Sequence, residues 1–369
     1  MKRSRRLPTL LALMLAMGAF GLACDVREPQ RRAGTVPRNP SGKPSAAVVA
    51  APTTGTPEAP QAVEAVEAAA DPFPSRFFGE DDAAVREALR TQPVASGKRG
   101  KGGRSVGFKL TLADGTVGYF KPDQDFSGAH YWSELAAHYL DRELGFGRVA
   151  PAVGRVLEWN RLRPLMGTDS RVAEVKVRPD GTVRGAFLAW IPGGLEPLPL
   201  RPGWERWVRR DGAMIRSPFV RPAQVRDGVA AAPTAGEPDT ADRAAEMSDL
   251  LIFDFLVQNV DRWGGDNTNV RTRGRGGPLV FLDNGAGFWP GIQRLPLMES
   301  RLRPLQKFRR STIEAIRAFD RAHFEQRIAR DPLAPILTER QLDGLEERCR
   351  AVLAHVEAMQ ARFGEAVWF

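Results

Sequence analysis

Apolar residues alternate with other residues on both sides of the pair Asp114-Gly115. The alternating apolar positions are Phe108, Leu110, Leu112, Val117 and Tyr119. Such alternation is typical of half-buried strands, and Asp-Gly between two such runs is typical of a two-residue hairpin loop. We therefore predict an antiparallel hairpin in which Phe108 pairs with Lys121. Because paired residues share a face of the sheet, Lys121 is expected on the same side as the five apolar residues.

Lys121 is unusual in residue type as well as in predicted position. Arginine is the default cation of this chain, because only eight of its 53 Lys and Arg residues are lysines. An ammonium group on an apolar face must be compensated by a partner or lose its charge. Two interpretations follow. Either Lys121 stands at the end of the strand and extends its ammonium group to water, or the ammonium group meets a bound phosphate.

A helical pattern follows over residues 127–145. Apolar residues recur there at spacings of three and four, at Trp132, Leu135, Ala136, Tyr139, Leu140 and Leu144. Ser127 or Asp125 can cap the start of this helix, and Gly145 ends it. Glu134 falls opposite the centre of the apolar stripe, so periodicity alone predicts a solvated charge there.

Two acidic loops lie in the C-terminal half of the chain. Residues 250–257 (LLIFDFLV) are apolar except at Asp254, which predicts a buried helix, and they lead into a loop crowded with carboxylates and amides (259–269). A short apolar strand at 279–282 then ends at Asp283. Metal-dependent phosphoryl transfer needs two such sites, one to orient the acceptor hydroxyl and one to hold the metal against the phosphates. The alternative is a pair of Asx turns that cap the strand.

The chemistry of these loops favours a hard cation. Carboxylate and amide oxygens suit Mg²⁺ or Mn²⁺, and the loop at 259–269 contains no histidine. A further candidate for anion binding is the segment 97–107, in which five glycines alternate with four cations. Consecutive backbone N–H groups of such a turn can point at one phosphate. A flexible basic loop is the alternative, because the spacing matches neither G-x-G-x-x-G nor a Walker A box.

The N-terminus carries an export signal. Residues 1–6 contain four cations, and residues 7–23 are uncharged and mostly apolar, as in a signal peptide. The segment ends in Gly21-Leu22-Ala23-Cys24, which resembles the bacterial lipoprotein box, in which the cysteine receives the lipid. An ordinary secretory signal or an uncleaved anchor are the alternatives. Residues 25–72 contain eight Pro, eleven Ala and no aromatic residue, which predicts a disordered tether.

Composition excludes some classes of protein. The chain has 369 residues, 43% of them hydrophobic and 26% charged, which suits a globular protein of two or three domains. Two Cys and four scattered His exclude a disulfide scaffold and a structural zinc protein. The net charge of +9 suits an acidic partner, membrane headgroups or nucleic acid without choosing among them.

Several blocks of sequence together resemble the four-jointed and Golgi casein kinase group of secretory-pathway kinases. The blocks are YFKP (119–122), ELAAHYLDRELGFGRVAPAVGR (134–155), SDLLIFDFLVQNVDR (248–262), VFLDNGAGF (280–288) and PLQKFRRST (304–312). In order and spacing the resemblance extends from about residue 97 to 357 and so spans nearly all of the part expected to fold.

The resemblance implies a role for four residues. Lys121 would bind the nucleotide phosphates, and Glu134 would pair with Lys121 or with the metal. Asp261 would be the catalytic base, and Asp283 would hold Mn²⁺ or Mg²⁺. The resemblance therefore overrides the interpretation of Glu134 as a solvated charge, and it favours the phosphate-binding interpretation of Lys121.

The chain departs from the family pattern at two positions of the catalytic loop. Relatives of the casein-kinase branch have D-R-H where this chain has Trp263. A metal-facing Asn is expected five residues after the base, where Asp266 stands, and Asn267 follows as an alternative ligand. The disulfides of the family are also missing, because Cys24 is assigned to lipidation and Cys349 to the core of the last helix.

The expected fold is α+β, a two-lobed atypical protein kinase-like fold. Its small N-lobe is rich in strands and has one long helix, and its larger C-lobe is mainly helical. The predicted parts are a lipoprotein signal peptide (1–23), an Ala- and Pro-rich tether (24–72), the N-lobe (73–194), a Pro- and Arg-rich insertion and connection (195–245) and the C-lobe (246–369).

We expect an ATP-dependent kinase that uses Mn²⁺ or Mg²⁺ and phosphorylates Ser or Thr of exported or surface proteins, with acidic substrates favoured by the Arg content. Gly102 and Gly103 would help to bind the nucleotide, and basic residues of the same loop would cover it. The protein would be lipid-anchored in a bacterial cell envelope. The alternatives are a pseudokinase that binds nucleotide, metal or a partner, and a kinase for a sugar hydroxyl. Nucleic acid is not an expected partner, because the arginines are spread over the whole chain and the export signal separates it from nucleic acid.

Overall fold

The computed structural model describes residues 73–101, 103–126, 128–213, 215–219, 235–263, 269–289 and 294–369, all within the unit Ala68–Phe369. The predicted signal peptide with Cys24, the tether, and the candidate residues Gly102, Asp266 and Asn267 lie outside these residues. Within the described part of the chain, no helix is both long enough and apolar enough to cross a membrane.

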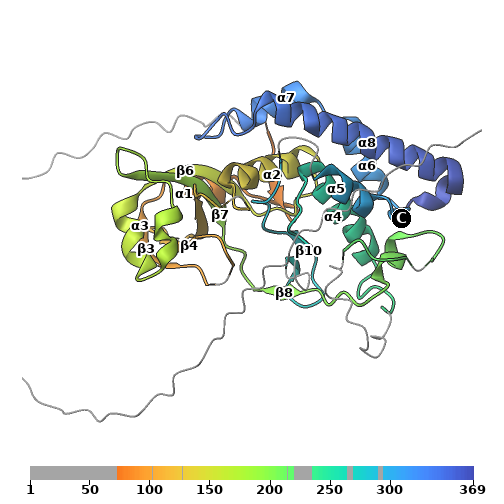
Figure 1. Cartoon of the computed structure of the whole chain (residues 1–369), viewed down its shortest axis with the longest axis horizontal. Helices are drawn as coiled ribbons and strands as arrows, with labels where there is room; N and C mark the ends of the chain where they lie inside the picture. Colours follow the sequence, from red (N-terminus) through yellow and green to blue (C-terminus); the bar gives the residue numbers. More distant parts are fainter. Residues whose placement is uncertain are drawn as a thin grey trace, which may run out of the picture. The chain divides into compact units, whose positions relative to one another are not determined.

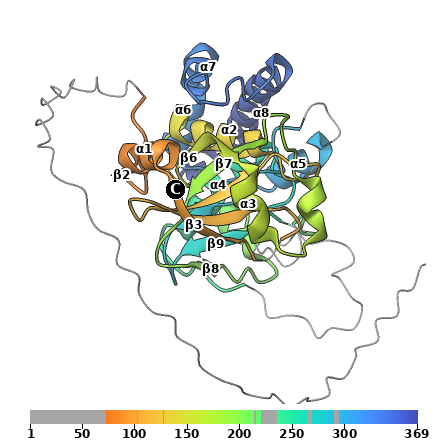
Figure 2. The same ribbon diagram turned by 90° about the vertical axis from the view of Figure 1, so that its left-hand side faces the viewer.

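A five-stranded antiparallel sheet forms the centre of the small lobe (Figure 1). Its strands, in spatial order, are β3 (Val94–Arg99), β4 (Phe108–Leu112), β5 (Val117–Pro122), β7 (Thr182–Ala189) and β6 (Ala152–Glu158). The helices α1 (Ala83–Thr91) and α3 (Trp159–Met166) flank this sheet (Figure 2). Three short elements complete the lobe: β1 (Arg76–Phe77), β2 (Glu80–Asp81) and the 3₁₀ helix η1 (Ser170–Glu174).

The predicted β4–β5 hairpin exists, but its register is one residue away from the predicted one. Phe108 pairs with Phe120 and not with Lys121. The loop has three residues, Ala113 to Gly115, and it closes with a hydrogen bond of 2.8 Å from the Leu112 amide to the Thr116 carbonyl. Gly115 has a φ of +87°, which suits the left-handed position that ends this type of three-residue loop. A one-residue slip moves every side chain of one strand to the opposite face.

Lys121 therefore lies on the other face from Phe108, Leu110 and Leu112, and the predicted shared face is wrong. Phe120 replaces Lys121 in the small-lobe core, where it packs edge to face on Phe187 at 5.9 Å between ring centroids. The strand partner of Lys121 is Ala186, which belongs to a second core shared with the large lobe. The correct register thus turns Lys121 toward the space between the lobes.

The predicted long helix is α2 (Tyr131–Glu143), and it is central to the molecule. Eleven of its 13 residues are buried, including Glu134, so the helix has no solvent-facing side where periodicity placed that charge. Its N-cap residue is His130, which makes no side-chain cap, so neither proposed capping residue starts the helix. Gly145, with a φ of +69°, follows its end as predicted.

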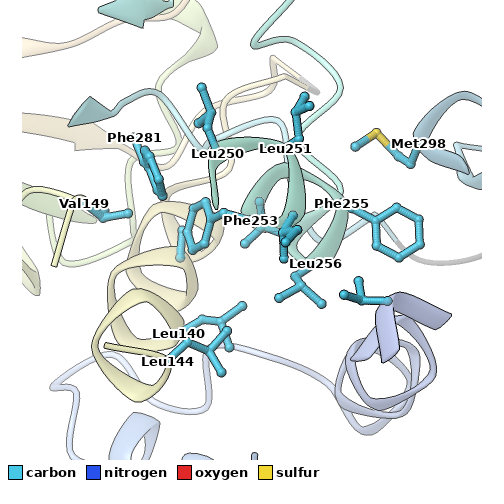
Figure 3. Close-up of a cluster of buried hydrophobic side chains, with 14 of the residues drawn as sticks. Leu140, Leu144, Val149, Leu250, Leu251, Phe253, Phe255, Leu256, Phe281 and Met298 are labelled. Carbon is cyan, nitrogen blue, oxygen red and sulfur yellow. The ribbon is translucent and has the colours of Figure 1, made fainter. Parts of the chain in front are cut away.

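The large lobe is built around α4 (Arg243–Val257), which is buried along its whole length as the pattern at 250–257 predicted. Leu140 of α2 and Leu144, which directly follows the helix, pack in the same hydrophobic cluster as Phe253 and Leu256 of α4 (Figure 3). The helix predicted for the N-lobe is therefore part of the large-lobe core. In Figure 1, α4, α5 and α6 lie on one side of α2, and the five-stranded sheet lies on the other.

The remaining elements of the large lobe surround α4. They are the strands β8 (Leu195–Pro197), β9 (Val270–Arg273) and β10 (Leu279–Phe281), paired in the order β10-β9-β8, the helices α5 (Leu295–Leu302), α6 (Arg310–Arg317), α7 (Arg321–Ile328) and α8 (Glu339–Phe363), and the 3₁₀ helices η2 (Trp204–Val208) and η4 (Gly364–Val367). The start of α8 has a capping box, formed by Thr338 and Gln341.

The stretch 195–245, predicted as an insertion and connection, is in its described part an integral piece of the large lobe. Strand β8 pairs with β9, and α4 already begins at Arg243. Buried side chains of the stretch belong to the large-lobe core, among them Trp204, Trp207, Phe219 and Ala235. The Pro and Arg content concealed these core residues, because they are too widely spaced to form a periodic pattern.

A buried ion pair fastens the N-terminal part of the small lobe to α2. Arg142 of α2 contacts Asp82 at 2.8 Å, and both side chains are only 2% exposed. Burial alone would raise the pKa of Asp82, but the charges of Arg142 and His138 and a hydrogen bond from Ser75 outweigh it and lower that pKa to about 2. The ionised form of Asp82 is therefore favoured by the fold.

We expect Asp82→Asn to lower the free energy of unfolding by about 3 kcal/mol at pH 7, because it removes one partner of a buried pair. The stabilising effect of ionised Asp82 is complete above its ordinary pKa and disappears as the pH falls through about 2. The difference between parent and variant in urea unfolding should therefore shrink between about pH 4 and pH 2. Asp343→Asn, at an exposed ion pair, is the control and should change stability by less than about 0.5 kcal/mol. A pH-independent difference between parent and Asp82→Asn would contradict this account.

Candidate functional site

Three of the predicted site residues meet between the lobes. Lys121 Nζ on β5 donates hydrogen bonds to Glu134 Oε1 on α2 and, at 2.7 Å, to Asp283 Oδ1 just after β10. Glu134 is fully buried, the Lys121 side chain is 15% exposed and the Asp283 side chain is 46% exposed. The predicted convergence of an ammonium group and carboxylates from different parts of the chain is therefore present, with Asp283 at its open side.

The charges of this group stabilise one another. Burial favours the neutral amine of Lys121, but Asp283 and Glu134 outweigh that effect and raise the pKa of Lys121 well above its ordinary value. The same ammonium group lowers the pKa of Asp283. At neutral pH the site thus contains one fixed cation between two carboxylates, which is the compensated alternative for a buried lysine.

Asp283 has a strained backbone conformation that surrounding contacts hold in place. Its φ is +53°, in the left-handed region that residues other than glycine seldom adopt. Its carbonyl accepts a hydrogen bond of 2.9 Å from Asn259 Nδ2, and its Oδ2 accepts one of 3.4 Å from Asn269 Nδ2. Strain of this kind persists only where neighbouring structure over-determines it, and it concentrates at functional sites.

The start of α2 is hydrogen-bonded to the loop that carries Asp283. The His130 amide donates to the Gly285 carbonyl at 2.9 Å, and Ser133 Oγ donates to the Asn284 carbonyl at 2.5 Å. Gly287 permits this close approach, because a Cβ atom there would lie 2.9 Å from Ser133 Oγ. Glu134 is thus held in a fixed position relative to Asp283.

Asp261, the predicted base, lies on the loop after α4 and is exposed. Asn259 Oδ1 accepts hydrogen bonds from the Asp261 amide at 3.1 Å and the Arg262 amide at 3.2 Å, which is an Asx turn. The amide group of the same Asn259 binds the Asp283 carbonyl. The loops of Asp261 and Asp283 are therefore directly connected through one buried side chain.

Trp263, the departure from the family pattern, points into the core of the large lobe. Its side chain is buried, its Nε1 donates to Asp254 Oδ2 at 3.0 Å, and its ring stacks on Trp204 at 5.4 Å with an interplanar angle of 3°. Trp263 therefore anchors the start of the loop after α4 to the large-lobe core.

The Gly-rich segment is held closed, and two of its arginines are already paired. The Gly100 amide donates to the Gly107 carbonyl at 2.7 Å. Arg104 binds both carboxylate oxygens of Glu174 in η1, and Arg99 pairs with Asp169 at 2.5 Å. The expectation that these basic residues cover a nucleotide needs correction for Arg99 and Arg104, which bind acidic side chains of the same lobe. Gly103 is exposed at the tip, with a φ of +71°.

The carboxylates suit a metal only together with other ligands. In the described part of the chain, no group of three or more His, Cys, Asp and Glu side chains is arranged so that it could hold a metal ion by itself. Glu134 Oε2, however, is buried without a hydrogen-bond partner, so one carboxylate oxygen is left over beside Asp283. Asn269 is a candidate that sequence reasoning missed, because it follows Asp261 by eight residues instead of the expected five.

Comparison with known proteins finds consistent similarity to one group of kinases. Residues 230–366 match the family model described as Golgi casein kinase, C-terminal, Fam20. Human glycosaminoglycan xylosylkinase is 25% identical, over 76% of this chain and 76% of that protein. Human extracellular serine/threonine protein kinase FAM20C is 22% identical, over 76% of this chain and 54% of that protein. The crystal structure of the Golgi casein kinase with Mn/ADP bound has a TM-score of 0.60 at 19% identity, covering 79% of this chain and 80% of that one. The resemblance and the α+β kinase-like fold are thereby confirmed.

We expect Glu174→Gln to loosen the Gly-rich segment, because it removes the charge that holds Arg104. Amide hydrogen exchange in the peptide 99–107 should become faster, by up to about fivefold for the loss of an exposed pair. Glu158→Gln, which breaks another exposed ion pair of the small lobe, is the control and should leave that peptide unchanged. Equal exchange in parent and Glu174→Gln would show that the pair does not hold the segment.

Proposed function

We propose that this chain, a relative of the Golgi casein kinases, transfers the terminal phosphoryl group of ATP to a hydroxyl group of an exported or surface protein, on Ser or Thr. The observation that carries the proposal is the contact of Lys121 with both Glu134 and Asp283. A charged ammonium group fixed beside an open carboxylate is suited to a nucleotide triphosphate bound with a cation. The related Golgi casein kinase structure with Mn/ADP bound supports ATP and Mn²⁺ as cofactors.

The residues present fit a divalent cation. Glu134 Oε2 is buried and unpartnered, and Asp283 offers a half-exposed carboxylate beside it. Glu134 and Asp283 would hold the ion, with Asn269 or the predicted Asp266 or Asn267 as further ligands. The ion would neutralise the charge of the terminal phosphates when bound. Lys121 would add a second positive charge at the same phosphates.

Asp261 would serve the acceptor. Its exposed carboxylate would accept or orient the proton of the acceptor hydroxyl while the new oxygen–phosphorus bond forms. The bond between the terminal phosphorus and the bridging oxygen of ATP breaks, and ADP leaves. Gly103, with the predicted Gly102, would place backbone N–H groups near the phosphates.

Two alternatives differ in chemistry. A related protein is named a xylosylkinase, which supports a sugar hydroxyl as the second acceptor class. A pseudokinase that binds nucleotide, metal or a partner is the other alternative, and the departures from the family pattern at Trp263 and Asp266 support it. We retain the protein hydroxyl as the primary proposal, with acidic substrates favoured by the net charge of +9.

The proposed location is a bacterial cell envelope, with the chain anchored through a lipid on Cys24. The apolar stretch 7–23 and the lipoprotein-type box support it. The name of the related extracellular serine/threonine protein kinase supports action outside the cytoplasm. Nucleic acid is not proposed as a partner.

We expect Glu134→Gln and Asp283→Ala to lower phosphate transfer from labelled ATP with Mn²⁺ by about a hundredfold or more, because each removes an electrostatic contact to the phosphates or the ion. Lys121→Ala should do the same. The matched control is Glu143→Gln, on the same helix, whose carboxylate is paired with Arg327 at 2.8 Å. It should lose stability but keep a turnover within about threefold of the parent, since it lies outside the site.

The acceptors in this assay should be an acidic protein and a xylose-terminated oligosaccharide. Incorporation into the protein supports the primary proposal, and incorporation into the sugar alone selects the sugar alternative. Binding of Mn²⁺ and ADP without any incorporation would select the pseudokinase. Parental turnover in Asp283→Ala would show that this carboxylate has been assigned wrongly.

A further inference from the structure

Four polar residues are buried between the two loops that present Asp261 and Asp283. We call them the loop-linking cluster: Asp254, Asn259, Arg262 and Asn284. All are at most 1% exposed, so none can be reached by a ligand. Polar groups are costly to bury unless they are hydrogen-bonded, and this cluster satisfies its members almost entirely with one another and with the two loops.

Arg262 links three elements. Its guanidinium forms an ion pair of 2.9 Å with Asp254 of α4 and donates to Asn284 Oδ1 at 2.7 Å. A further hydrogen bond of this guanidinium goes to the Leu282 carbonyl. The planar fork of an arginine can serve these separate acceptors at once, whereas the ammonium group of a lysine cannot match the same geometry.

Asn259 forms the second link. Its oxygen accepts from the amides of Asp261 and Arg262, and its nitrogen donates to the Asp283 carbonyl at 2.9 Å and to Asn284 Oδ1 at 3.2 Å. One side chain therefore sets the start of the first loop and the backbone of Asp283. Asp283 is the residue with the strained φ of +53°, which needs such support.

The cluster is an expensive way to stabilise a core. A buried ion pair often stabilises less than apolar side chains of similar size, but a fully satisfied polar network fixes one geometry. Its contacts go to the inner sides of the two loops, and the carboxylates of Asp261 and Asp283 remain outside. In phosphoryl transfer, a misplacement of about 1 Å can cost about a hundredfold in rate.

We infer that Asn259 and Arg262 are positioning residues, which set the separation and orientation of the Asp261 and Asp283 carboxylates through the loop-linking cluster. Both side chains are fully buried, so neither is placed to touch substrate or cation. The effect on catalysis that this inference predicts rests on the proposed function. The inference also predicts an effect on cation and nucleotide binding at Asp283, which does not require catalysis.

The test compares Arg262→Lys with Arg348→Lys in the full chain. Arg348 is also buried in the large lobe, and its Nε donates to the Leu256 carbonyl of α4 at 2.7 Å, next to the same loops. Both substitutions keep a basic side chain but replace the planar guanidinium group with an ammonium group. For each variant we would measure the melting temperature, the turnover with ATP and Mn²⁺, and the affinity for Mn²⁺–ADP by titration calorimetry. For Arg262→Lys we expect turnover to fall about tenfold or more and affinity for Mn²⁺–ADP to fall severalfold. For Arg348→Lys we expect a lower melting temperature, with turnover and Mn²⁺–ADP affinity unchanged.

Asn259→Ser is the second variant, for the case in which Arg262→Lys does not fold. Serine can still accept from the Asp261 amide, but it loses the donor to Asp283. The same falls in turnover and in Mn²⁺–ADP affinity are expected. The inference is overturned if turnover and Mn²⁺–ADP affinity fall in proportion to the loss of melting temperature in all variants, the control included. It is also overturned if turnover and affinity do not change.

The proposed function can fail separately. A parent chain that binds Mn²⁺–ADP without transferring phosphate refutes the kinase, and the affinities then still decide whether the cluster positions Asp283. A parent that neither binds nor transfers refutes both.

Discussion

The structure depends on one buried ammonium group with carboxylates from two other elements around it. Lys121 belongs to a strand of the small lobe, Glu134 to the central helix and Asp283 to a loop of the large lobe. A lysine in this position would be costly without its partners, because burial penalises the charged form. Folding therefore has to bring the three residues together, and contacts of the surrounding elements hold them in place.

The central helix α2 is fixed from both directions. Its apolar side chains pack in the large-lobe core, and its first turn is hydrogen-bonded to the loop of Asp283 through His130 and Ser133. Glu134 is consequently as firmly placed as the large lobe itself. The small lobe supplies the cation, while the large lobe and its packed helix supply the acidic side of the site.

Local sequence patterns correctly predicted the hairpin and the two helices, but they predicted poorly on which face of an element a side chain lies. The hairpin at 108–122 was predicted from alternation, but a three-residue loop shifted the pairing by one and moved Lys121 to the opposite face. The apolar run around Asp254 correctly predicted a buried helix, yet nothing local indicated that Asp254 pairs with Arg262. Periodicity also misjudged Glu134, because a helix covered on all sides has no solvent-facing stripe.

By itself the sequence determined the strands around Asp114-Gly115, the strand at 279–282, the helical patterns at 127–145 and 250–257, the identity of Lys121, Glu134, Asp261 and Asp283 as candidates, and the family resemblance. These follow from local spacing and from matching blocks of sequence, which do not depend on the tertiary structure. Only the tertiary structure decided which side chains meet, that Asn269 reaches Asp283, and that the arginines of the Gly-rich segment are already paired. Such contacts join residues far apart in the chain, and their energies depend on burial and register, which no local window contains.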